Sequence, residues 1–335
     1  MTERPSIRFE TLDGMRGVAA IVVLIFHGMG ISLLRLPHGY LAVDLFFMLS
    51  GFVLAAVYTP RFVEGMRIGK FLLIRAKRLY PLYLAGLLLG FFVRMQQDIY
   101  YAIKSLVFGI FTLPTPGPAV AYLYYVNVPS WSLFCELLIN IVFVLWLWKA
   151  RTRTLLILAA AAAVAMLYAY YVYGNLKGGA HVGDMWVGLA RVTFAFPLGI
   201  VLYRIHRLCG FDRFRLKPSL IGASLPLVLL IGFVGLHDLF VVLLIFPAMV
   251  LAGASFEPKY GQYWALLGSL SYPLYCLHDP ILRLLRYIVT RTPYPELLGT
   301  SGMLVVILVC WHIGGFLDRH LYKSLQARLR WMQEV

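Results

Sequence analysis

Charged residues are scarce in this sequence. Only 13% of its 335 residues are Asp, Glu, Lys or Arg, and 61% are hydrophobic, whereas soluble domains carry about 25% charged residues. A water-soluble fold of this length could not bury that much apolar surface. The composition therefore excludes an ordinary soluble domain and predicts an all-α protein that crosses a membrane several times.

Acidic residues are half as numerous as basic ones, 15 against 30, which gives a net charge of +15. A basic balance of this size can indicate nucleic-acid binding. Here most of the Lys and Arg residues lie in short segments between apolar runs, as the positive-inside rule of membrane proteins requires. We therefore expect no nucleic-acid partner and attribute the charge to membrane topology.

Cysteine is rare as well. The four cysteines have neither metal-ligand spacing nor the density of a disulfide framework, and they are Cys135, Cys209, Cys276 and Cys310. We expect them to be small buried side chains, and we predict no metal site and no permanently bound cofactor.

Long apolar runs are what the sequence does contain. About ten are long enough to cross a bilayer, which takes about 17–25 residues. They cover residues 15–34, 39–58, 75–93, 129–148, 154–173, 185–204, 219–236, 239–254, 264–289 and 300–318. The first run has no small-residue cleavage site after it, so we expect a retained span rather than a signal peptide.

The distribution of positive charge predicts the orientation of these spans. With both termini cytoplasmic, most basic residues lie in inner segments, and the outer ones hold only Arg35, Arg94, Lys104, Lys177 and Arg291. Segment 99–128 must then cross the membrane twice or not at all. It has one short apolar run followed by three prolines, so we predict a re-entrant or outer-surface segment. We expect a single membrane-embedded domain over 1–335, ending in a short basic cytoplasmic tail at 319–335.

Two ionisable residues interrupt the first apolar run, "LDGMRGVAAIVVLIFHGMG". Arg16 and His27 are eleven residues apart, which places them on one helix face about 16 Å from each other along the axis. Arg16 then lies near the cytoplasmic surface and His27 in the outer half of the bilayer. Neutral imidazole can take a proton from a hydroxyl group. The alternatives are a snorkelling arginine and a histidine that only bonds a neighbouring helix.

Two carboxylates are predicted to lie at the depth of His27. Asp44 opens the second span from the outer side, and Glu136 lies about two turns into the span at 129–148. We therefore expect Glu136 or Asp44 to orient His27. Arg191, with Asp184, starts a later span from the outer side and either extends this polar site or caps it.

A basic cluster marks the cytoplasmic side. Arg75 and Arg78 are three residues apart with Lys77 between them, in "MRIGKFLLIRAKRLYPLY", where Pro81 breaks the pattern. Guanidinium groups bind phosphates bidentately, although an ordinary loop on lipid headgroups would have the same composition. The pair Ser50–Gly51 would let a ligand or a neighbouring helix approach the backbone.

A late segment, "SYPLYCLHDP", adds a second intramembrane histidine. His278 follows Tyr272 and Tyr275 and precedes Pro280. A histidine beside a helix broken by proline indicates a polar cavity, and a cap on the kink is the alternative.

Taken together, these motifs resemble integral-membrane acyltransferase family 3, which includes carbohydrate O-acetyltransferases of bacterial envelopes. The resemblance covers nearly the whole chain and rests on five segments in the family's order. They are "LDGMRGVAAIVVLIFH", "GYLAVDLFFMLSGF", Arg75-x-x-Arg78, "PSWSLFCELLIN" and "SYPLYCLHDP". Asp279 departs from the pattern, because relatives often have a bulky aromatic residue after the histidine.

The resemblance implies roles for individual residues. Arg16 and His27 match the family's catalytic pair, and Arg75 and Arg78 its double-arginine motif, which is linked with the acyl-CoA donor. Ser50 and Gly51 match the family's Ser-Gly pair, and Glu136 matches the acidic residue of its Trp-Ser-…-Glu motif. We assign catalysis to His27, Arg16, Glu136 and Asp44, donor binding to Arg75, Arg78, Lys77, Ser50 and Gly51, and acceptor binding to His278, Tyr275, Trp131 and Arg191.

The predicted function is acyl transfer, most simply of acetyl, from cytoplasmic acyl-CoA as co-substrate to a hydroxyl group of an envelope or exported carbohydrate or glycolipid. His27 acts as the base or carries the acyl group. The family's frequent fused esterase-like domain is absent from this sequence, so transfer is expected to finish within the membrane domain. A transporter or flippase of acylated or glycosylated lipids is the alternative, and a structural subunit is a third reading.

The expected location is the bacterial inner membrane, in contact with membrane lipid. The sequence leaves open the acceptor, a succinyl or longer acyl donor, and whether the chain forms a homodimer or joins a polysaccharide-assembly complex.

Overall fold

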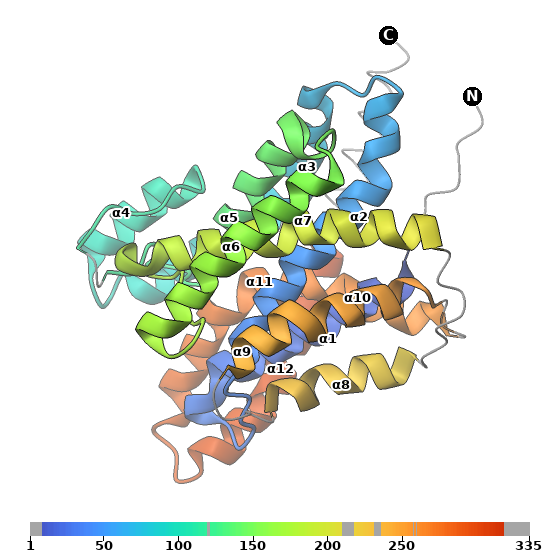
Figure 1. Cartoon of the computed structure of the whole chain (residues 1–335). Coiled ribbons are helices and arrows are strands. Elements are labelled where there is room, and N and C mark those ends of the chain that lie inside the picture. Colours follow the sequence, from blue (N-terminus) through green and yellow to red (C-terminus); the bar gives the residue numbers. More distant parts are fainter. Residues whose placement is uncertain are drawn as a thin grey trace.

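The structure is a bundle of helices (Figure 1). This computed structural model describes residues 9–118, 121–209, 218–230, 236–256, 258 and 260–317. In these residues no β-strand occurs, and eight helical segments are long and apolar enough to cross a membrane. The chain is therefore an all-α multi-pass membrane protein, as the sequence predicts.

The helices follow one another with short connections. They are α1 (Glu10–Gly28), α2 (Ala42–Val63), α3 (Ile68–Arg94), α4 (Ile99–Ile110), α5 (Ser130–Val142), α6 (Thr152–Tyr173), α7 (Met185–Cys209), α8 (Pro218–Leu230), α9 (His237–Phe240), α10 (Phe246–Ala254), α11 (Gly261–Val289) and α12 (Pro295–Leu317). A π-helical segment, Phe143–Leu147, extends α5, and another, Val241–Ile245, joins α9 to α10.

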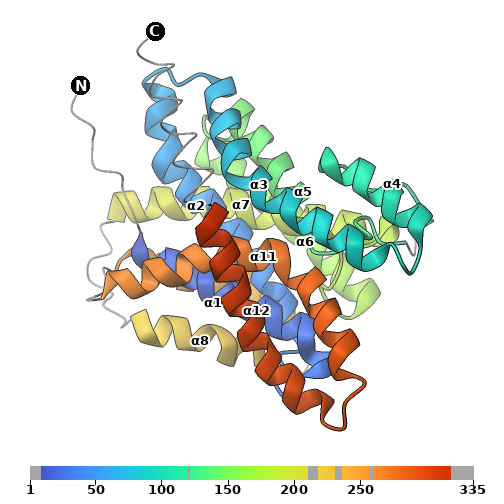
Figure 2. The same ribbon diagram turned by 180° about the vertical axis from the view of Figure 1, so that it is seen from behind.

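Each predicted span coincides with a helix, although the end of 219–236 falls partly outside the described residues. The count of ten spans and the cytoplasmic position of both termini stay predictions, and the basic tail at 319–335 lies outside the described part of the chain. In the segment 99–128, α4 has only 12 residues, too few to cross a bilayer. Both views place α4 at the edge of the bundle (Figures 1 and 2), which agrees with a re-entrant or outer-surface segment.

Two expectations about helix boundaries are wrong. Helix α3 begins at Ile68, seven residues before the predicted span, and continues through Pro81, so Arg75 and Arg78 lie on a helix rather than in a loop. Helix α11 likewise continues through Pro273 and Pro280, and the break expected near His278 is absent. Membrane helices tolerate proline because neighbouring groups and local adjustments satisfy the freed carbonyl groups.

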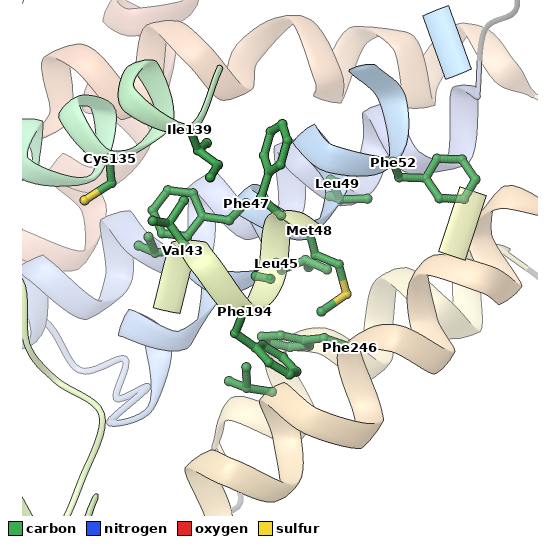
Figure 3. Close-up of a cluster of buried hydrophobic side chains, with 14 of the residues drawn as sticks. Val43, Leu45, Phe47, Met48, Leu49, Phe52, Cys135, Ile139, Phe194 and Phe246 are labelled. Atoms are coloured by element: carbon green, nitrogen blue, oxygen red, sulfur yellow. The ribbon is translucent and has the colours of Figure 1, made fainter. Parts of the chain in front are cut away.

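Helix α1 lies between two clusters of buried side chains and contributes to both. One cluster centres on α2, α5, α7 and α10, where apolar side chains of α2 interdigitate with those of its neighbours (Figure 3). The other involves α3, α11 and α12. The site described below lies where these two halves meet.

Parallel packing of α1 against α11 brings polar residues of both helices together. Gly14 meets the ring of Trp264, Gly17 meets the backbone of Leu267, and His27 lies beside His278. These contacts follow the same order along both helices, so each residue of α1 in the contact faces a residue of α11 that lies about 250 positions later in the sequence.

Small residues let α2 and α7 approach closely. A Cβ atom at Gly51 would collide with the carbonyl oxygen of Phe196, and one at Gly199 with that of Met48. Such small-residue contacts hold helices together in lipid, where there is little hydrophobic driving force between them. The structure thus gives Gly51 a helix-packing position, and its predicted place in a donor site is not found.

Candidate active site

A cavity of about 120 Å³ lies among α1, α2, α3, α5 and α11. Its walls combine apolar side chains with a group of charged and hydroxyl-bearing ones. The lining residues are Arg16, Val43, Phe46, Phe47, Ser50, Arg75, Arg78, Leu79, Ser132, Leu133, Glu136, Ser271, Tyr272 and Tyr275. Six predicted site residues, from five helices, therefore lie around one cavity: Arg16, Ser50, Arg75, Arg78, Glu136 and Tyr275. Lys77 is not among the lining residues.

The charged groups of this cavity are three guanidinium groups and one carboxylate. Nη2 of Arg75 lies 3.3 Å from Oε1 of Glu136, and the Ser50 hydroxyl donates a hydrogen bond to the same oxygen. Both ion-pair partners are mostly buried, with 12% and 15% of their side chains exposed. Glu136 pairs with Arg75, and Asp13 lies close to Arg16 from the preceding turn of α1, so three guanidinium groups face two carboxylates around the cavity and one positive charge remains in excess. In a poorly hydrated site such an excess favours an anionic ligand.

A second, largely apolar cavity of about 250 Å³ lies between α3 and α5, beside the first. Arg75, Leu79 and Leu133 line both cavities. Asn140 is buried in the wall of the second cavity, and within the described structure neither its amide nitrogen nor its amide oxygen has a hydrogen-bond partner. The two cavities therefore adjoin at Arg75, Leu79 and Leu133, with polar groups in the first and mostly apolar walls in the second.

The two intramembrane histidines contact each other. His27, in the last turn of α1, and His278, in the middle of α11, have ring centroids 5.0 Å apart, and Nε2 of His278 lies 3.3 Å from Nδ1 of His27. His278 is almost fully buried, whereas His27 is half-buried. The structure therefore joins two residues that lie 251 positions apart in the sequence.

Backbone carbonyls determine which ring nitrogens of this pair carry protons. Nδ1 of His278 lies 2.8 Å from the carbonyl of Leu274 and 3.0 Å from that of Tyr275, and Nδ1 of His27 lies 2.9 Å from that of Val23. A neutral imidazole must donate through the nitrogen that faces a carbonyl. We infer that the single Nδ1–H of His27 is shared between the carbonyl of Val23 and Nε2 of His278, which leaves Nε2 of His27 with an available lone pair.

Helix α11 connects the cavity to the histidine pair. Tyr272 and Tyr275 line the cavity, and His278 follows one turn later. The hydroxyl oxygen of Tyr275 lies 2.8 Å from that of Ser132 and donates to the carbonyl of Pro129. Beyond His278, Asp279 forms a 3.0 Å ion pair with Arg283. Polar groups thus continue along one helix from the arginine-lined cavity to His27.

The prediction that Asp44 or Glu136 orients His27 is wrong. Glu136 binds Ser50 and Arg75, while Asp44 binds Arg191. The position of each side chain along its helix was readable from the sequence, but the direction in which it leaves the helix was not. Among the described residues, the ring of His278 and the carbonyl of Val23 hold the ring of His27 instead.

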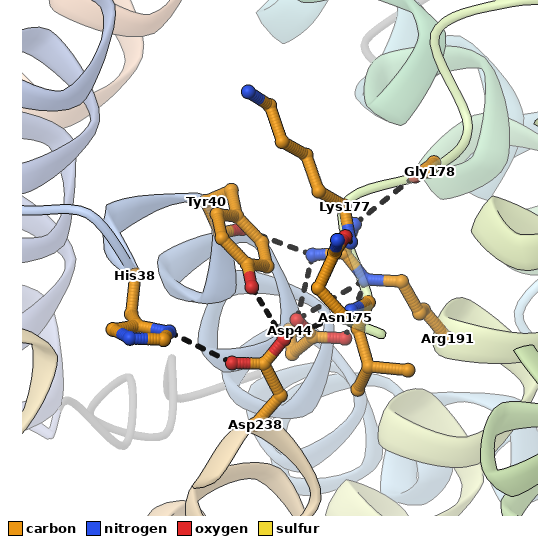
Figure 4. Close-up of polar contacts among 9 residues, drawn as sticks. His38, Tyr40, Asp44, Asn175, Lys177, Gly178, Arg191 and Asp238 are labelled. Atoms are coloured by element: carbon orange, nitrogen blue, oxygen red, sulfur yellow. Dashed lines mark hydrogen bonds and ion pairs between the residues drawn. The ribbon is translucent and has the colours of Figure 1, made fainter. Parts of the chain in front are cut away.

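Asp44 and Arg191 form a buried ion pair (Figure 4). Nη2 of Arg191 lies 2.7 Å from Oδ2 of Asp44, and both side chains are at most 1% exposed. The remaining donors of Arg191 bond the carbonyls of Gly178 and Tyr40. The guanidinium group also lies 5.4 Å from the ring centre of Trp131. The three residues predicted for catalysis or acceptor binding here, Asp44, Arg191 and Trp131, are therefore buried in helix-to-helix contacts, and none of them lines the cavity.

Replacing Arg191 by methionine is expected to destabilise the protein by about 3–5 kcal/mol, because it leaves the Asp44 carboxylate buried without a cation. Thermal unfolding in detergent would measure this loss. The double variant Arg191→Met, Asp44→Leu should recover much of it, since both charges are removed. A single variant that unfolds like wild type but loses acyl transfer would return Arg191 to the acceptor site.

Several groups near the site were not foreseen. Ser271 carries no charge and occurs in an apolar run, so nothing in the sequence distinguishes it from a packing residue, whereas Ser132 belongs to the Trp-Ser-…-Glu motif and was available as a signal. The Asp279–Arg283 pair has the spacing of a helical ion pair, and that signal was available. His38, His237 and Asp238 come together only through the fold.

Comparison with known proteins places the chain among acyltransferases. A family model described as an acyltransferase domain matches residues 9–314. Protein 2 in picA locus of Rhizobium radiobacter is 39% identical over 165 residues, which are 44% of this chain and 86% of that protein. Acyltransferase MdmB of Streptomyces mycarofaciens is 30% identical over 156 residues, 42% of this chain and 39% of that protein. Exopolysaccharide production protein ExoZ of Rhizobium meliloti is 30% identical over 112 residues, 31% of this chain and 33% of that protein. No solved structure matches the chain significantly.

Proposed function

The chain belongs to acyltransferase family 3, as its five motifs predict, and we propose that it moves an acetyl or related acyl group from cytoplasmic acyl-CoA to a hydroxyl group of an envelope or exported carbohydrate or glycolipid. The membrane acyltransferase class follows from the family. The donor, the acceptor, the catalytic residues and a location in the bacterial inner membrane belong to the proposal.

One observation carries this proposal. Helices α1 and α11 contribute to both the arginine-lined cavity and the His27–His278 pair, with Tyr272 and Tyr275 between them on α11. Arginine is suited to bidentate binding of phosphate groups, and a histidine with an available lone pair is suited to proton removal. An acyl-CoA molecule carries phosphates at one end and a reactive thioester at the other, so it requires this combination.

In the proposed complex Arg75 and Arg78 bind donor phosphates from the cytoplasmic side. The two adjoining cavities then take the pantetheine arm, whose amide groups suit the buried amide of Asn140. Arg16 contacts the donor on its way along α1, and the thioester carbonyl lies near His27, about 16 Å further along that helix. A cavity of about 120 Å³ is far smaller than the 300–1,000 Å³ of ordinary ligand sites, so we expect the helices around it to separate when the donor binds.

Transfer then needs one base. Nε2 of His27 removes the proton of the acceptor hydroxyl, whose oxygen attacks the thioester carbonyl, and the carbon–sulfur bond breaks. The CoA thiolate leaves with the proton from the imidazolium, which restores neutral His27. An acyl-His27 intermediate is the other route. Nε2 of His27 attacks the thioester carbonyl, the carbon–sulfur bond breaks, and the CoA thiolate takes the Nδ1 proton. The acceptor hydroxyl then attacks the acyl carbon, the carbon–nitrogen bond breaks, and the hydroxyl proton returns to the imidazole.

The carbohydrate acceptor is proposed from a relative and from the position of His27. The name of the Rhizobium meliloti relative refers to exopolysaccharide production, and that protein aligns with only a third of this chain. We nevertheless favour an exported glycan or its lipid-linked precursor, because His27 lies at the end of the bundle that the basic residues assign to the outer face.

Labelled acetyl transfer tests the proposal. Protein purified in liposomes with [¹⁴C]acetyl-CoA on the cytoplasmic side should transfer label to a glycan or glycolipid fraction of the source membrane, and the acceptor should gain the mass of one acetyl group. Transport without chemistry would move the acceptor and leave its mass unchanged. In that case the transporter alternative would replace the acyltransferase proposal.

A further inference from the structure

We propose that His38, His237 and Asp238 form a binding site for a zinc-type transition-metal ion. His38 lies in the segment before α2, and His237 and Asp238 open α9. One potential ligand atom from each residue lies within 4.8 Å of the other two. His237 and Asp238 are neighbours in the sequence, and the fold brings His38, 200 positions before Asp238, next to them.

The second oxygen of Asp238 is already held in place. Oδ2 accepts hydrogen bonds from the Tyr40 hydroxyl and from the backbone N–H of Leu176. Oδ1 faces Nδ1 of His38 at 2.8 Å (Figure 4). Metal-binding carboxylates are commonly fixed in this way by hydrogen bonds from outer groups, so Oδ1 is oriented toward the space that the two imidazoles share.

The two imidazole rings converge on that space. The ring centroids of His38 and His237 are 4.3 Å apart. His237 and Asp238 are each 2% exposed, whereas the side chain of His38 is 24% exposed and leaves a route from the surface. Ligand atoms around one tetrahedral zinc ion lie about 3.3 Å apart, given zinc–ligand distances of about 2.0–2.1 Å. Rotation of the rings is therefore enough to complete a three-ligand site, with water as the fourth ligand.

The donor set selects the class of metal. Two imidazole nitrogens and one carboxylate oxygen suit zinc, cobalt or nickel ions, while magnesium and calcium prefer oxygen ligands only. Binding would displace the proton through which His38 bonds Asp238.

Such an ion would link the segment before α2 to α9, and through Asp238 also to the segment after α6, at the end of the bundle that contains His27. His38 precedes α2, Asp238 opens α9, and Leu176 follows α6. Gly39, next to His38, packs against Phe26, the neighbour of His27. The metal would thus be structural, and its absence would loosen the segment that supports the end of α1.

Measurements of bound metal and of thermal unfolding test this site independently of any acyl-transfer activity. Full-length protein, purified in detergent with a tag free of histidine, is treated with EDTA, dialysed against zinc chloride and then against metal-free buffer. We expect about one zinc ion per chain by mass spectrometry. The unfolding temperature should rise with the logarithm of the zinc concentration, and magnesium chloride should not change it.

Two variants and one matched control identify the ligands. His38→Gln keeps a hydrogen-bond donor for Asp238 but loses the imidazole. This variant and His237→Gln should each abolish bound zinc and the zinc-dependent rise in unfolding temperature. His181→Gln is the control, because His181 also pairs with a carboxylate, Asp184 at 3.1 Å, but belongs to no three-ligand group in the described residues. It should retain zinc. Wild-type protein without bound zinc, or a folded His38→Gln variant that retains it, would overturn the proposal and leave a hydrogen-bonded cluster.

Discussion

Replacing His27 by alanine is expected to lower kcat for acyl transfer about 10²- to 10⁴-fold, the usual contribution of a positioned general base. The KM for the donor should stay close to that of wild type, because the arginines that line the cavity lie nearer the other end of α1. Steady-state kinetics with purified protein in liposomes would separate the two constants. Truncating a half-buried side chain at the end of a helix should leave the fold intact.

Two other histidines make this experiment specific. His312 is exposed on α12 and bonds only its own helix among the described residues, so His312→Ala should retain full activity. His278→Gln should reduce kcat less than His27→Ala does. It should also shift the pH dependence of kcat, because it changes the group that faces Nδ1 of His27. Wild-type turnover by His27→Ala would remove His27 from the mechanism.

CoA release by wild-type protein in the absence of acceptor distinguishes the two chemical routes. If His27 carries the acyl group, wild-type protein mixed with acetyl-CoA and no acceptor should release about one equivalent of CoA in a rapid burst. A peptide containing His27 should then gain the mass of an acetyl group. If His27 only removes a proton, CoA release should wait for the acceptor.

Much of the fold was readable from the sequence because a bilayer imposes simple requirements. A span needs about 20 apolar residues with all backbone groups bonded internally, and these runs are visible without a structure. Prolines were misleading. Pro280 suggested a broken helix beside His278, and Pro81 an interruption after the basic cluster, but α11 and α3 continue through them, because neighbouring helices can satisfy the carbonyl groups that proline leaves free.

The sequence predicted correctly for only some of the site residues which way their side chains face. Arg16, Arg75, Arg78 and Glu136 do surround one cavity. Asp44, at a depth similar to that of His27, turns instead toward Arg191 and is buried there. Helix rotation depends on packing between helices, for example on which face carries Gly51 or Gly17, and that information is distributed over several helices rather than present in any one motif.

Neutralising the cavity arginines is expected to weaken donor binding strongly. Arg75→Gln and Arg78→Gln should each raise the KM for acetyl-CoA about 10- to 100-fold, because a hydrogen bond to a charged group contributes about 1.5–3 kcal/mol. The kcat at saturating donor should change much less, since His27 and His278 are untouched. Lys77→Gln is the matched control: Lys77 lies beside Arg78 but outside the cavity lining, and its KM should stay near that of wild type.

Arg75 has a second partner, and a double variant separates its two roles. Its ion pair with Glu136 is mostly buried, so Arg75→Gln could raise KM only because an uncompensated carboxylate distorts the cavity. In the double variant Arg75→Gln, Glu136→Gln that carboxylate is neutral. If Arg75 binds donor phosphate, the double variant keeps the high KM. If Arg75 serves only to neutralise Glu136, its KM returns to the wild-type value, and the donor phosphates must bind elsewhere.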